Sequence, residues 1–124
     1  MPARLRLADP VAVREALGRV AAGGEEADRA DLRLLVKHFL AVLESRAPGA
    51  SVEVRVPPYA AVQVIPGVRH TRGTPPAVVE MDALTWVGLA GGELSWGDAV
   101  GSGRVSASGE RTDLAPYLPL HQPG

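Results

Sequence analysis

The stretch SVEVRV, residues 51–56, decides the fold class, because the chain changes its hydrophobic period there. Its three valines alternate with Glu53 and Arg55, a two-residue period that is typical of a strand with one buried face. Before this stretch, apolar residues recur at intervals of three and four, the period of an amphipathic helix. The sequence therefore predicts helices first and a sheet afterwards.

Two helices are predicted on the amino-terminal side of this stretch. The first begins at Asp9-Pro10, an N-cap residue followed by proline at the first helical position, and ends at Gly23-Gly24. The second begins near Asp28 or Asp31 and ends at Ala47-Pro48-Gly49. Its apolar arc is the wider of the two, so we expect it to be the more deeply packed helix.

Strands and short helices are predicted on the carboxyl-terminal side. They are the strands 59–65, 68–72, 77–81 and 104–108, and short helices that open at Asp82, Ser95 and Thr112, the last of which carries Leu114, Leu118 and Leu120. Because helices and strands are partly segregated along the chain, we expect an α+β domain with a mostly antiparallel sheet covered on one face by helices.

Length and composition limit the class of protein. A chain of 124 residues is expected to form one domain, residues 1–124. The net charge of −1 argues against a nucleic-acid partner, and the absence of cysteine excludes disulfides, thiol catalysis and thiolate metal sites. No apolar run is long enough for a signal peptide or a membrane span, so we expect a cytoplasmic protein.

No catalytic or metal-binding motif is present in the sequence. His38, His70 and His121 are expected on a helix, in a loop and in the tail, and no metal-site spacing links any two of them. The sequence also contains no nucleophile elbow and no phosphate-binding glycine loop. We therefore expect no enzyme activity, no catalytic residue, no metal and no cofactor.

The segment RHTRGTPP, residues 69–76, has two interpretations. Arg69, His70 and Arg72, with backbone donors around Gly73, are suited to binding a carboxylate or phosphate. Alternatively, the glycine and prolines shape a turn, and the basic side chains are solvated or pair with nearby carboxylates.

The two tryptophans, Trp86 and Trp96, pose a similar choice. Both are suited to core or rim packing, with the indole N–H donating to a carbonyl. The alternative role is lining an apolar ligand pocket beneath the short helices, but plain packing is favoured because pockets are few per protein.

Three long runs carry a resemblance to a known family. VPPYAAVQ (56–63), GVRHTRGTPPAVVEMDALTW (67–86) and GGELSWGDAVGSGRVSASGERTDL (91–114) resemble the bacterial sterol carrier protein-like family of actinobacterial proteins. The resemblance covers residues 52–120 and fits the two leading helices more loosely. It implies a twisted, mostly antiparallel sheet of about five strands, covered by two N-terminal helices, further helices and a short C-terminal helix, with an apolar tunnel between the layers.

The resemblance also implies a function, which is the non-catalytic binding of a lipid-like or other apolar small molecule in that tunnel. The side chains expected nearest the ligand are Val62, Val64, Leu84, Trp86, Val87, Leu89, Trp96, Val100, Leu114 and Leu118. Arg69, His70 and Arg72 would contribute if they lie at the mouth of the tunnel, where they would meet the polar end of the ligand.

Two alternatives remain open at this point. One is an interaction or structural module that binds no ligand and holds a protein partner or a second copy of itself. The other is an enzyme remnant, since similar domains form the C-terminal part of mycothiol-dependent maleylpyruvate isomerase-like proteins. Those proteins carry their metal in an N-terminal four-helix bundle with histidine ligands, whereas this chain has two helices there and no histidine triplet. The sequence leaves the ligand's identity, the protein partners and the oligomeric state undecided.

Overall fold

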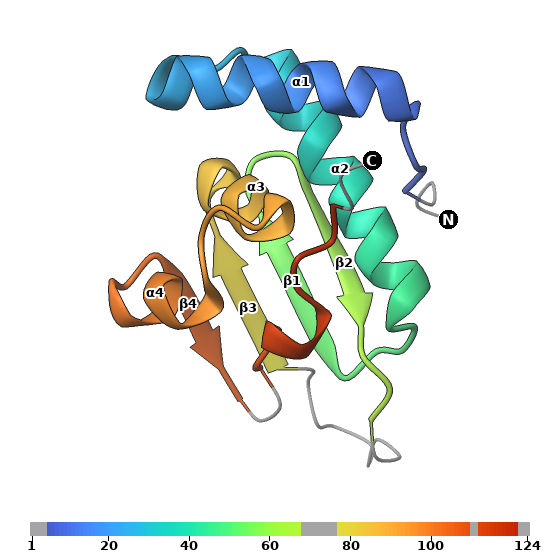
Figure 1. Cartoon of the computed structure of the whole chain (residues 1–124). Coiled ribbons are helices and arrows are strands. Elements are labelled where there is room, and N and C mark those ends of the chain that lie inside the picture. The colour runs from blue at the N-terminus through green and yellow to red at the C-terminus, as the bar shows by residue number, and fades with distance from the viewer. Residues whose placement is uncertain (1–4, 68–76, 110–111, 122–124) are drawn as a thin grey trace.

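The computed structural model describes residues 5–67, 77–109 and 112–121 (Figure 1). In chain order, its elements are α1 (Pro10–Gly23), the 3-10 helix η1 (Gly24–Glu26), α2 (Arg29–Arg46), β1 (Val52–Val56), β2 (Ala60–Val64), β3 (Ala77–Met81), α3 (Ala83–Gly91), α4 (Trp96–Gly101), β4 (Val105–Ser108) and the 3-10 helix η2 (Ala115–Tyr117). This mixture of helices and one open sheet agrees with the α+β class.

Side-chain caps begin the four α-helices at the positions that local chemistry favours. Asp9, Asp28, Asp82 and Ser95 each accept a hydrogen bond from a backbone N–H of the first turn. The second helix thus begins after Asp28, the first of the two expected positions. The third ends at Gly91 and is followed by Gly92, whose φ of +89° lies in the left-handed region that favours glycine.

The sheet differs from the expectation in its number of strands and in one pairing. The strands lie in the order β2–β1–β3–β4, so the described residues form four strands where the sequence predicts about five. The candidate strand 68–72 lies outside the described residues. β1 is antiparallel to β2 but parallel to β3, and β3 is antiparallel to β4. β2 reverses the chain, so β3 starts at the same end of the sheet as β1 and runs in the same direction.

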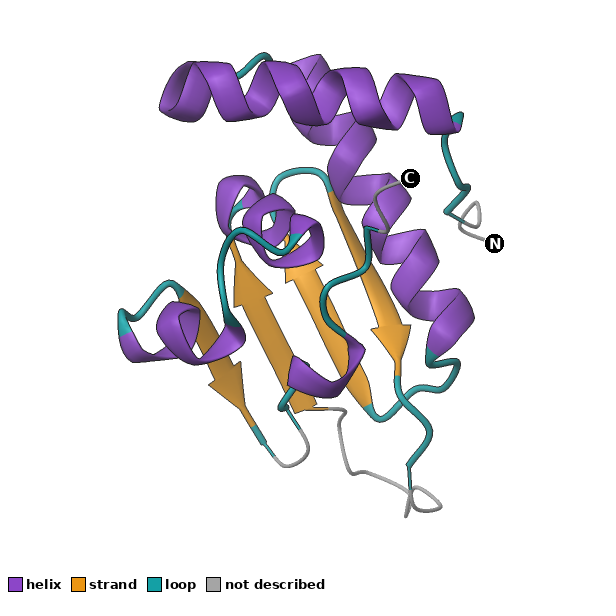
Figure 2. Ribbon diagram, in the orientation of Figure 1, coloured by secondary structure: helices purple, strands orange, loops and turns teal. Residues whose placement is uncertain are grey.

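One face of the sheet carries the core. Val52, Val54 and Val56 are fully buried, and the register places Val54 between Val62 of β2 and Val79 of β3. The opposite face of the described strands is mainly polar, with Glu53, Arg55, Gln63, Glu80, Ser106 and Ser108. The short helices α3, α4 and η2 lie over one face of the sheet, and α2 runs beside β2 (Figure 2). The fold therefore has two layers around one valine-rich core.

α3 contributes the largest fully buried side chain, Trp86. Its indole Nε1–H donates to the carbonyl of Val36 in α2 at 3.4 Å, so the ring lies where α2 and α3 meet. Trp96 is only partly buried, at the start of α4. Trp86 therefore packs in the core with its indole N–H bonded to a carbonyl, which is the first of the two roles considered for the tryptophans.

The last helix was predicted to carry Leu114, Leu118 and Leu120, and this is wrong. The structure has only one 3-10 turn there, Ala115–Tyr117, preceded by an Asp113 side chain that accepts from the N–H of Ala115. Pro116 and Pro119 cannot donate a backbone hydrogen bond, so an α-helix cannot continue through this segment. The chain after the turn is extended, and it leads towards α2 (Figure 1).

The turn between α2 and β1 closes around Ile65. The N–H of Ile65 donates to the carbonyl of Ala47 at 2.6 Å, and its own carbonyl accepts from the N–H and the hydroxyl of Ser51. Ile65 has a φ of +71°, which is unusual for a β-branched residue. Gly49 passes so close that an added Cβ would lie 2.5 Å from the Pro66 nitrogen and nearer still to the Ile65 carbonyl. This close approach requires glycine at position 49.

No helix among the described residues combines the length and the apolar character that crossing a bilayer demands.

Candidate functional site

A pocket of about 280 Å³ opens between α1, α2 and the C-terminal segment, and we call it the α1–α2 pocket. It is lined by Pro10, Val13, His38, Phe39, Val42, Arg46, Leu120 and His121. The volume lies close to the lower end of the range for small-molecule sites, about 300–1,000 Å³. As far as the structure describes it, the lining combines apolar walls with three nitrogen-bearing side chains and includes no aspartate or glutamate.

The spacing of residues along α2 explains one wall of the pocket. His38, Val42 and Arg46 are four residues apart, so they lie on one stripe of the helix. Phe39, which is 1% exposed, borders this stripe and forms part of the apolar wall together with the buried Val13 of α1. One side of α2 thus presents an apolar surface next to two nitrogen-bearing side chains.

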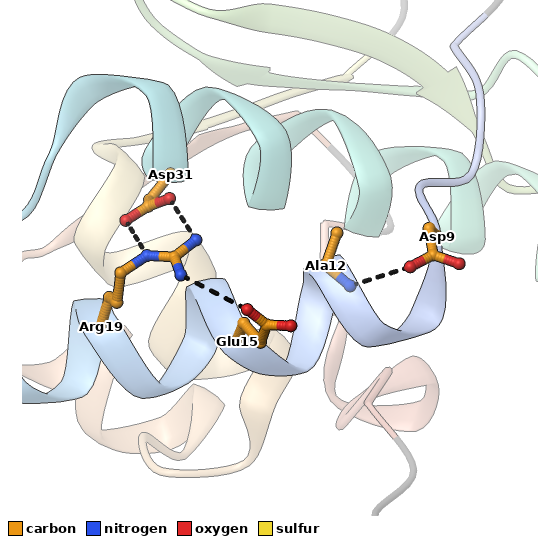
Figure 3. Close-up of polar contacts among 5 residues, drawn as sticks. All are labelled: Asp9, Ala12, Glu15, Arg19 and Asp31. Carbon is orange, nitrogen blue, oxygen red and sulfur yellow. Dashed lines mark hydrogen bonds and ion pairs between the residues drawn. The ribbon is translucent and has the colours of Figure 1, made fainter.

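α1 forms the opposite wall and is attached to α2 near both of its ends. At its C-terminal half, Arg19 makes a two-point ion pair with Asp31 of α2, with Nε and one terminal nitrogen each 2.9 Å from a carboxylate oxygen (Figure 3). Glu15 lies 3.9 Å from the same guanidinium (Figure 3). The hydrogen bond from Arg19 lowers the pKa of Asp31 below its usual value.

At the other end, the chain before α1 is bound to His38. The backbone N–H of Ala8 donates to Nδ1 of His38 at 2.9 Å. A ring that accepts at Nδ1 is neutral and carries its proton on Nε2. Burial lowers the pKa of His38, and the positive charge of His121 lowers it further.

The C-terminal segment closes the third side of the pocket. The N–H groups of Leu120 and His121 both donate to the carbonyl of Ala90, at 2.9 Å each. Arg46 donates to the carbonyls of Pro119 and Leu120 at 3.4 and 3.1 Å. These contacts hold residues 119–121 against α2 and α3.

An aromatic contact joins the two histidines of the pocket. Phe39 makes a T-shaped contact with each ring, with centroid distances of 5.0 Å to His38 and 6.2 Å to His121. In the part of the chain that the structure describes, no three histidine, aspartate or glutamate side chains are grouped as they are in a metal site.

The residues predicted to line a tunnel are only partly brought together. Six are buried in the core: Val62, Val64, Trp86, Val87, Leu89 and Leu114. Leu84, Trp96 and Leu118 are half-buried, and Val100 is 45% exposed on α4. Leu84 and Val87 line a second, smaller hollow of about 200 Å³ between α1 and α3. Arg69, His70 and Arg72, predicted at the mouth of a tunnel, lie outside the described residues.

A third hollow, beside the start of α2, is larger but has fewer lining residues. It measures about 550 Å³, yet only Arg29, Arg33, Pro58 and Tyr59 line it. Four side chains cannot enclose most of a ligand's surface, as small-molecule sites do. The α1–α2 pocket is therefore the better candidate.

Sequence reasoning missed the residues of this pocket. The signal that could have indicated His38 and Arg46 was their four-residue spacing on α2 around Val42, next to Phe39. No local signal indicated His121, which lies 83 residues after His38 in the C-terminal tail. Its backbone N–H donates to the carbonyl of Ala90, which holds it at the pocket.

The lowered pKa of His38 predicts a pH-dependent stability. The unfolded chain binds a proton near the ordinary histidine pKa, about 6.5, whereas the folded chain binds it only at lower pH. The free energy of unfolding should therefore fall between pH 7.5 and 5.5, and level off once the folded ring is also protonated. His38→Asn, whose Oδ1 can still accept from Ala8, should show a smaller fall. Urea unfolding of the wild type and of His38→Asn at several pH values measures this difference. If the free energy of unfolding falls equally with pH in both, the prediction is wrong.

Comparison with known proteins identifies the family. Residues 28–120 match the family described as bacterial SCP ortholog, where SCP stands for sterol carrier protein. A search of curated proteins found no match. The matched residues begin at the N-cap of α2 and end in the C-terminal segment of the α1–α2 pocket, so they include the whole sheet and its covering helices but not α1. They span most of the 124 residues, and the chain therefore belongs to the bacterial sterol carrier protein ortholog family.

Proposed function

We propose that the protein is a non-catalytic, cytoplasmic binder of a small apolar molecule, which it holds in the α1–α2 pocket. Membership of a sterol carrier protein family supports the general function. The lining of the pocket carries the proposal for this site, because it offers apolar contacts around an open volume. These contacts come from Val13, Phe39, Val42 and Leu120.

The described part of the sheet–helix interface offers less room for such a molecule. Val64, Trp86 and Leu114 are fully buried there, and Leu89 is 1% exposed. Side chains packed in this way leave few voids larger than a water molecule. The α1–α2 pocket already has the open volume, so binding there requires no displacement of the core.

A pocket-filling substitution tests the proposal. The probe is 2-naphthylmethanol, an uncharged bicyclic alcohol. With about a dozen non-hydrogen atoms at roughly 0.3 kcal/mol or more each, it should bind with a Kd of roughly millimolar or tighter. Val42→Trp, which places an indole in the pocket, should weaken binding at least about tenfold. Ligand-observed NMR and isothermal titration calorimetry measure the affinity.

Val100→Trp is the matched control, because Val100 is exposed on α4 and does not line the pocket. It adds the same indole and should leave the affinity unchanged. Circular dichroism shows whether each variant is folded. If the probe fails to bind, or if both variants bind it as well as the wild type, the site proposal is wrong.

Native mass spectrometry of protein purified without detergent provides an independent test. A co-purified small molecule supports the binding function. A ligand-free dimer would instead favour the interaction module.

A further inference from the structure

We infer that the α1–α2 pocket selects molecules that carry a carboxylate on a compact apolar skeleton. This inference rests on the proposed function and concerns the polar end of the ligand. It follows from the hydrogen-bonding capacity that remains on the three nitrogen-bearing side chains of the pocket.

Arg46 is the first of these side chains. Its guanidinium has five N–H donors, and two of its nitrogens donate to the carbonyls of Pro119 and Leu120. Those two carbonyls fix the position of the group but leave its positive charge without a carboxylate partner among the described residues. Arg46 is therefore held at the wall of the pocket, and three of its N–H donors remain available to a ligand.

His38 is the second. Because Nδ1 accepts from Ala8, the neutral ring carries its proton on Nε2, which makes that nitrogen a donor. No hydrogen bond from this nitrogen to another described residue is present. The hydrogen bond from the Ala8 backbone thus fixes the ring as a donor at Nε2 towards anything that binds beside it.

The other polar group of the described lining is a third nitrogen-bearing side chain. His121 lines the pocket and contacts Phe39, and it brings a further imidazole. Among the described residues, the lining includes no aspartate or glutamate that would repel an anion or pair with the arginine. A carboxylate accepts several hydrogen bonds and pairs with guanidinium in a forked geometry, so it suits this donor set better than an alcohol or an amine.

The apolar part of the ligand is limited by the pocket's size. A volume of about 280 Å³ suits a ring system or a short branched chain, and a long acyl chain would extend out of it. Phe39, with Val13 and Leu120 beside it, provides the apolar contact. The expected ligand class is therefore a small aromatic or alicyclic carboxylic acid.

Three probes on one skeleton test this inference: 2-naphthoate, 2-naphthylmethanol and 2-naphthylmethylammonium. At pH 7.5, we expect the carboxylate to bind about tenfold more tightly than the alcohol, and the ammonium to bind more weakly than the alcohol. Arg46→Gln should reduce the preference for carboxylate over alcohol to about threefold or less. Its amide can still donate to the C-terminal carbonyls, and a purely structural loss would weaken both probes equally.

Arg33→Gln is the matched control, since it removes one positive charge from α2 at an exposed position outside the pocket. It should leave the preference for carboxylate over alcohol unchanged, apart from a small loss of carboxylate affinity at low salt, because salt screens the removed charge. If the alcohol binds as tightly as the carboxylate, the inference is wrong and the proposed function stands. If none of the three probes binds, both are wrong. An unchanged preference in Arg46→Gln excludes the role given to the arginine.

Discussion

Replacing Trp86 by alanine is expected to lower the free energy of unfolding by about 3–5 kcal/mol. The indole is fully buried where α2 meets α3, and its N–H donates to the carbonyl of Val36. Alanine would leave a cavity that the surrounding side chains can fill only in part. Because domains of this kind are stable by about 5–15 kcal/mol, the loss is a large fraction of the total. Equilibrium unfolding in urea, followed by circular dichroism, measures the change.

Trp96→Ala is the matched control for this experiment. Trp96 begins α4 and is only partly buried, so the same truncation removes less apolar contact. We expect it to cost less than half as much as Trp86→Ala. Similar costs for the two variants would show that Trp86 does not form the centre of the core.

The second large effect is expected for Gly49→Ala, which should destabilise the protein by at least about 2 kcal/mol. A Cβ at this position would lie 2.5 Å from the Pro66 nitrogen and still closer to the Ile65 carbonyl. That carbonyl also accepts from the N–H and hydroxyl of Ser51, so it cannot move away without breaking the turn. Urea unfolding gives the free energy, and the loss should be visible as a lower midpoint with an unchanged slope.

Gly18→Ala is the control, the same substitution at a position where a side chain has room. Gly18 is exposed in the middle of α1, and an added Cβ would meet nothing within 4 Å. Alanine is the better helix former, so this variant should be more stable by up to about 1 kcal/mol. If Gly49→Ala were also neutral or stabilising, the claim that Gly49 lies too close to Ile65 for a side chain would be wrong.

Much of the fold was predictable because its signals are local. Asp9, Asp28, Asp82 and Ser95 cap helices by bonding to backbone groups within three residues, and that chemistry can be recognised in a short window. The alternation around Glu53 likewise identifies a strand and its buried face without any knowledge of its neighbours.

The strand pairings were less predictable, because they depend on residues far apart in the chain. β1 pairs in parallel with β3, and the register that joins Val54 to Val79 bridges 25 positions. Alternation shows that each strand has a buried face, but it does not show which strand lies beside it. The local propensity of Leu114, Leu118 and Leu120 was misleading for a different reason, since two prolines remove donors that a helix requires there.

The candidate site was the least predictable part. Its polar groups come from α2 and from the end of the chain, and the strongest chemical clue, the neutral state of His38, comes from a hydrogen bond to the backbone of Ala8. A backbone donor has no signature in the sequence. The sequence presents the histidines only as separate groups, and their common contact with Phe39 results from the packing of the last residues against Ala90.

The position of α1 has a consequence for engineering. This helix precedes the residues matched by the family, yet it provides one wall of the pocket through Pro10 and Val13. The sheet and the helices that cover it lie within the matched residues. Substitutions at Pro10 and Val13 can therefore change the shape of the pocket without altering any residue of the sheet or of its covering helices.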